Sequence, residues 1–84
     1  MFYYLIICRS LTFAQRTAAV LDKIGISAAI QRVPRTISTE GCSHAVKIPH
    51  RKLPDALEAL ARAELMPKHI YITAGDGVYR EVEF

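Results

Sequence analysis

One cysteine lies near the end of an irregular segment between two strand-like runs. The segment, residues 33–44, reads VPRTISTEGCSH, and Cys42 is its thiol. A cysteine reacts as the thiolate, and its pKa falls near cations or a helix N-terminus. Gly41 allows the sharp turn that would present the sulfur at the surface. Three residues could supply positive charge: Arg9, Arg35 and His44. Cys42 is therefore a candidate nucleophile or sulfur-holding group, and the alternative is a partly buried apolar residue.

The other candidate groups each have two interpretations. Cys8 ends an apolar run, which favours a buried core thiol, but a position close to Cys42 would let it act as a resolving thiol. His44 shares the alternation of the strand that follows it, so it is either a residue at the margin of the core or a base for Cys42. Arg35 either binds an anionic substrate or is a solvated turn residue.

Composition limits the function classes. The 84 residues predict a single domain over 1–84, and 51% hydrophobic with 23% charged residues exclude a disordered chain. The net charge of +3 is weak support for a nucleic-acid partner, which we do not expect. With two cysteines, no CxxC pair and three scattered histidines, we expect no metal, no cofactor and no disulfide scaffold.

Location follows from the apolar run at residues 2–8. This run is too short to cross a bilayer, and it lacks the basic leader and cleavage site of a signal peptide. We therefore expect a cytoplasmic protein without membrane association, in which both thiols are reduced.

The elements that must position these groups follow from hydrophobic periodicity. Period-two or continuous apolar runs predict strands over 2–8, 26–33, 45–48 and 69–73. Helical spacing predicts one helix that is capped by Ser10 or Thr12 and stops at Gly25, and a second over 53–61. The turn at residues 75–77 predicts that 78–84 return as a fifth, edge strand.

The order β-α-β-β-α-β predicts an α+β, ferredoxin-like sandwich, with an antiparallel sheet and two helices on one face. Right-handed crossovers make strands one and two parallel, with strand three between them. One end of the sheet then gathers Cys8, Arg9, the start of helix one, Arg35, Cys42, Lys68 and His69. The open face gathers Tyr3, Leu5 and Ile7 with Tyr71 or Ile72, and such an apolar patch predicts a homodimer.

The chain resembles the putative selenium/sulfur carrier protein-like family over about residues 4–72. The resemblance rests on YLII with Arg9-Ser10 after it, on the helix end at 21–26, and on a Pro-Arg element followed by Ile37-Ser38, Gly41-Cys42 and Ala45-Val46. The chain departs from the family pattern at Ser43 and His44. The resemblance implies that Cys42 carries a persulfide or selenium adduct. It also implies that the accompanying motif is Arg9, Ser10, Pro34, Arg35, Ser38 and Gly41.

A sulfur or selenium carrier, more accessory protein than enzyme, is thus the leading hypothesis, with donor and acceptor proteins as partners. The alternative is a non-catalytic binding or regulatory module that dimerises through its sheet face.

Overall fold

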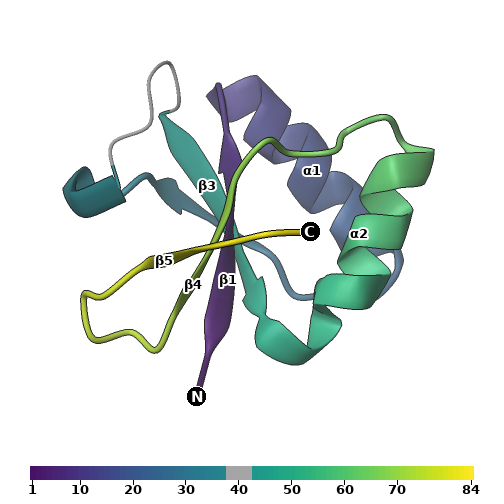
Figure 1. Cartoon of the computed structure of the whole chain (residues 1–84). Coiled ribbons are helices and arrows are strands. Elements are labelled where there is room, and N and C mark those ends of the chain that lie inside the picture. Colours follow the sequence, from purple (N-terminus) through teal and green to yellow (C-terminus); the bar gives the residue numbers. More distant parts are fainter. Residues whose placement is uncertain (38–42) are drawn as a thin grey trace.

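The computed structural model describes residues 1–37 and 43–84 (Figure 1). In these ranges the chain is α+β, with five strands in one antiparallel sheet of order β2-β3-β1-β4-β5 and both helices on one face (Figure 1). The elements are β1 (Tyr3–Cys8), α1 (Leu11–Lys23), β2 (Ala29–Arg32), the 3-10 turn η1 (Arg35–Ile37), β3 (His44–Pro49), the 3-10 turn η2 (His50–Lys52), α2 (Leu53–Arg62), β4 (Ile70–Thr73) and β5 (Arg80–Val82). The predicted ferredoxin-like arrangement with a C-terminal edge strand is confirmed.

The register of β1 fixes which groups share one end of the sheet. β1 lies between β3 and β4 and is antiparallel to both, and Cys8 stands opposite His44. On the other side of β1, the Ile7 N–H donates to the His69 carbonyl at 3.1 Å. The C-terminal end of β1, the start of β3 and the approach to β4 therefore meet, as strand order predicts.

The ends of α1 decide between the two predicted caps and correct the expected burial of Ile24. Ser10 is the N-cap, because its Oγ accepts from the Phe13 N–H at 3.1 Å; Thr12 lies inside the helix. At the other end Gly25 has φ +80°, as expected of a helix stop. Ile24, which helical spacing places on the apolar stripe, is 50% exposed, and Ile26 is buried instead. The turn through Gly25 returns the chain to the core one residue later, and β2 begins only at Ala29, three residues later than predicted.

The sheet has apolar side chains on both faces. The main core lies under the helices and includes Ile6, Val46, Leu21 and Leu60. A smaller cluster on the other face, which we call the second core, consists of Leu5, Ile7, Ile37 and Ala45 with partly buried Val33, Tyr71 and Tyr79 against it.

The second core corrects the predicted exposed patch. Leu5 and Ile7 are 1% and 4% exposed, since Ile37 of η1 and the two tyrosines cover them. Of the two candidates on β4, Tyr71 joins this face. Ile72 stands opposite Tyr4 in the register, so it points to the helix side.

Two general findings concern the described residues alone. Neither helix is long and apolar enough to cross a membrane. No group of three or more histidine, cysteine, aspartate or glutamate side chains is placed to hold a metal ion.

Candidate functional site

The predicted thiol site is built around a segment whose two flanks are attached to the sheet. Residues 38–42 lie outside the described ranges, so the roles of Ser38, Gly41 and Cys42 remain predictions. Before this segment, Ile37 is buried in the second core. After it, the Ser43 carbonyl accepts from the Val33 N–H at 3.1 Å, which extends the β2–β3 ladder by one pair. In sequence, Cys42 thus directly precedes Ser43, whose carbonyl is hydrogen-bonded to the end of β2.

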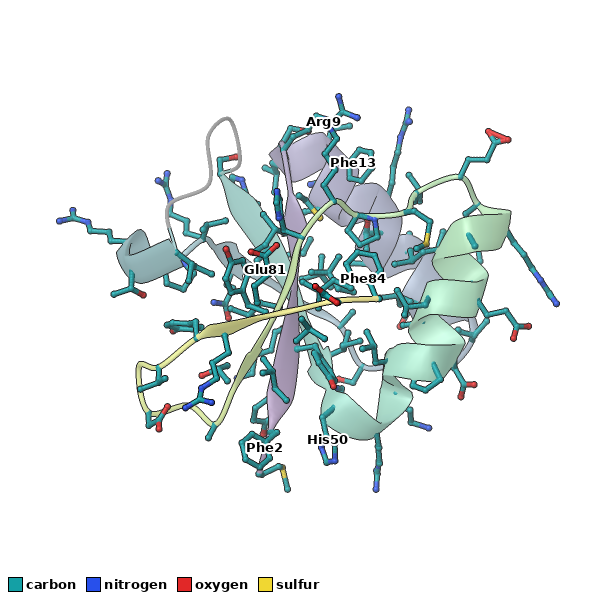
Figure 2. The ribbon with its side chains drawn as sticks, in the orientation of Figure 1. Phe2, Arg9, Phe13, His50, Glu81 and Phe84 are labelled. Carbon is teal, nitrogen blue, oxygen red and sulfur yellow. The ribbon has the colours of Figure 1, made fainter. Side chains whose placement is uncertain are left out.

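This end of the sheet carries positive charge from Arg9 and from the N-terminus of α1. Arg9 follows Cys8 at the end of β1, and its guanidinium lies over the Phe13 ring at 5.4 Å from the centroid (Figure 2). Arg35 is exposed in η1. Within residues 1–37 and 43–84 neither arginine forms an ion pair. The first turn of α1 starts here and contains no acidic residue, so the partial positive charge of the helix N-terminus adds to the charge of Arg9.

Ser10 and His44 have defined local partners. Ser10 caps α1, so its hydroxyl oxygen is engaged with the Phe13 N–H and its place at this end of the sheet is structural. His44 is half-buried on β3, and its Nδ1 lies 2.8 Å from Ser43 Oγ. This contact orients the imidazole two residues after Cys42. A role for His44 as base stays a prediction.

Cys8 is a core residue. It is 1% exposed, its thiol donates to the Ile6 carbonyl at 3.6 Å, and its sulfur lies 4.0 Å from Thr17 Oγ1 of α1. The interpretation as a buried thiol is therefore confirmed. A reagent or substrate in solution reaches Cys8 only when the packing of α1 on β1 opens. The Cys8–Cys42 pair remains a prediction, because Cys42 lies outside the described part of the chain.

The same end of the sheet carries a polar cluster that the sequence interpretation missed. His69, which strand order places at this end of the sheet, has its Nδ1 2.6 Å from Oε2 of Glu81 on β5. Glu81 stands opposite Tyr71 in the register. Burial, the charge of Glu81 and a hydrogen bond to its carboxylate together raise the pKa of Tyr71. The only sequence signal for this cluster is the hairpin turn at 75–77, which brings His69 close to Glu81, 12 positions later in the chain.

Comparison with known proteins gives one family match. The family described as putative Se/S carrier protein-like matches residues 3–72, which run from β1 into β4 and include both cysteines. No curated protein and no solved structure matches the chain.

Proposed function

This chain belongs to the putative Se/S carrier protein-like family, and we propose on that premise that it carries sulfur or selenium on Cys42. The observation that carries the proposal is the charge at the end of the sheet to which Cys42 is joined. Arg9 and the N-terminus of α1 lie there, Arg35 precedes the segment in η1, and in the described ranges no carboxylate pairs with either arginine. Such surroundings favour a thiolate and its anionic persulfide.

The transfer step needs only thiol chemistry. The Cys42 thiolate attacks the outer, sulfane sulfur of a persulfide on a donor protein. A new S–S bond forms on Cys42 as the donor's S–S bond breaks, and the electron pair stays on the donor's cysteine as its thiolate. The persulfide proton is kept or exchanged with water, so no external oxidant or reductant is needed. The reverse sequence delivers the sulfur to an acceptor, and a selenium atom would move by the same route.

The supporting residues have separate roles in this proposal. Arg9 and Arg35 attract the anionic adduct, and His44 exchanges the proton. Ser10 fixes the start of α1, and Ser38 and Gly41 shape the backbone before Cys42. Because the thiolate must be available, the proposal includes a reducing, cytoplasmic setting and contact with donor and acceptor proteins.

The test is sulfur loading followed by intact-mass measurement. The protein is incubated with a cysteine desulfurase and cysteine, and we expect a gain of one sulfur atom. Cys42→Ser abolishes the gain, whereas Cys8→Ser keeps it because the Cys8 thiol is buried. No gain on the wild type, or an equal gain on Cys42→Ser, overturns the proposal. A pH series of alkylation adds a second readout: the pKa of Cys42 should lie below the ordinary value of about 8.5.

The alternative of a regulatory module has less support than the sequence suggested. Its docking surface was the apolar face of the sheet, where Leu5 and Ile7 are now seen to be covered by residues of the same chain.

A further inference from the structure

A pocket of about 340 Å³ lies at the opposite end of the sheet from Cys8 and Ser43. Phe2, just before β1, and the turn between β4 and β5 form its walls. That turn projects away from both helices (Figure 1), and the residues that line the pocket all lie outside α1 and α2. The volume is within the range of small-molecule sites, about 300–1,000 Å³.

The walls are held by contacts within the chain. The Phe2 carbonyl accepts from the His50 N–H at 3.2 Å, and the two rings meet edge-on with centroids 6.3 Å apart (Figure 2). Ile72 and Arg80 stand opposite each other in the β4–β5 register, and so point to the same side of the sheet. Asp76 Oδ1 accepts from the Val78 N–H at 3.1 Å, which fixes the turn. These contacts hold Phe2 and the turn in place on two sides of the pocket.

The chemistry of the lining is apolar with one charge of each sign. Phe2, Ile72 and Val78 supply the apolar part. Asp76 and Arg80 also line the pocket. They make no ion pair with each other or with any other side chain that the structure describes. A ligand that suits this lining offers an anion to Arg80, a cation to Asp76 and an apolar part to Phe2, Ile72 and Val78.

We propose that this pocket binds a free hydrophobic α-amino acid. Its carboxylate pairs with the Arg80 guanidinium, which matches carboxylate geometry in two parallel hydrogen bonds. Its ammonium pairs with the second carboxylate oxygen of Asp76. Its side chain covers Phe2, Ile72 and Val78. A peptide end supplies only one of the two charges, which is why the free amino acid is the better match.

This site is separate from the proposed sulfur chemistry. Of the pocket-lining residues, Ile72 alone falls within residues 3–72, the range that the family match covers. Binding at the pocket and loading at Cys42 are also measured by different signals, so either proposal can fail while the other stands.

The test is a titration of the 15N-labelled protein with L-leucine and L-phenylalanine, followed by NMR. We expect saturable shifts confined to Phe2, residues 72–78 and Arg80, with a dissociation constant between about 0.1 and 1 mM for so open a site. N-acetyl-L-phenylalanine lacks the ammonium and L-phenylalaninamide lacks the carboxylate, so both should bind at least about fivefold more weakly.

Charge-matched variants complete the experiment. Arg80→Gln and Asp76→Asn should each weaken binding at least about fivefold, and the amide introduced by Asp76→Asn keeps an oxygen that can hold the turn. Arg16→Gln and Asp22→Asn on α1 remove the same charges from residues that do not line the pocket and should bind like the wild type. No shifts at about 10 mM ligand, shifts outside the pocket only, or equal binding of the two blocked compounds would each overturn the proposal.

Discussion

Ser10 determines where α1 begins. The start of α1 lies at the end of the sheet where we propose the sulfur chemistry. Its hydroxyl satisfies the Phe13 N–H, one of the donors that a helix leaves without a partner at its first turn. We predict that Ser10→Ala lowers the free energy of unfolding by about 1 kcal/mol, measured by urea titration.

Thr12→Ala is the matched control for Ser10. Thr12 fits a capping box with Gln15 in sequence but lies inside the helix, so its loss should change the free energy of unfolding by less than about 0.5 kcal/mol. If Thr12→Ala costs as much as Ser10→Ala, the helix begins elsewhere.

Tyr71 gives the molecule a dependence on alkaline pH. Its pKa is raised in the folded chain by burial and by Glu81, so above its ordinary value, near 10, the folded state binds more protons than the unfolded state. This contribution to stability is complete below that pH and is lost as pH rises through the folded-state pKa. We predict that the free energy of unfolding falls as the pH rises above about 10 and that Glu81→Gln makes the fall smaller.

The direct measurement for Tyr71 is its own titration, followed by the absorbance of the phenolate. Tyr71→Phe identifies the Tyr71 signal among the four tyrosines by difference. Glu81→Gln should move the Tyr71 pKa down, toward its ordinary value. An unchanged Tyr71 titration in Glu81→Gln would show that burial acts alone.

The position and contacts of a single residue are predictable where they depend on its neighbours in sequence. The apolar run before Cys8 predicts a buried thiol correctly. The first turn of α1 offers two capping patterns, and only the backbone decides between Ser10 and Thr12. The His69–Glu81 contact depends on the β4–β5 register, which residue types alone do not determine.

At the scale of elements, both helices end in the same way. The Ile26 N–H donates to the Leu21 carbonyl and the Leu65 N–H to the Leu60 carbonyl, each across a residue of positive φ. This is the Schellman motif, and it returns an apolar residue to the core. In α1 the left-handed position is Gly25, but in α2 it is Glu64, with φ 58°.

Because Gly25 and Glu64 occupy the same left-handed position, substitutions at the two residues should have opposite effects on stability. Glu64→Gly relieves a conformation that disfavours a side chain and should raise the free energy of unfolding by about 0.5 to 1 kcal/mol. Gly25→Ala should lower it by about 1 kcal/mol through backbone strain alone, since an added Cβ meets no atom within 4 Å. Both are measured by urea titration, and a destabilised Glu64→Gly would show that the Glu64 side chain contributes more than its φ costs.

The order of helices and strands was predictable because helices and strands have different hydrophobic periods. The residues at which these elements begin and end were harder to predict. β2 begins at Ala29, after a stretch in which Ile26 is buried by the turn that ends α1. The 3-10 turn η1 lies in a segment that reads as irregular. Ile37 is buried there because it meets Leu5 and Ile7, which are about 30 positions away along the chain and so leave no local pattern.

At the scale of the whole molecule, the sheet separates two ends and two faces. One end carries Arg9 and the N-terminus of α1, and the other end holds the pocket at Phe2 and Arg80. The helices cover one face, and the second core closes the centre of the other. A chain of 84 residues has a small core and a thin margin of stability, so this second cluster matters to whether the chain stays folded.

Ile37 is the test of that contribution. It is 7% exposed and reaches the open face from η1, so Ile37→Ala removes most of its contact with Leu5 and Ile7. We predict a loss of about 2 kcal/mol in the free energy of unfolding, the lower part of the range for such changes because the cluster is small. Ile30→Ala makes the same change at a side chain that is 38% exposed and should cost less than about 1 kcal/mol. Urea titration of both variants measures the difference. Equal losses would mean that the open face is held by its strands alone, and the apolar patch predicted from sequence would again be available for a second copy of the chain.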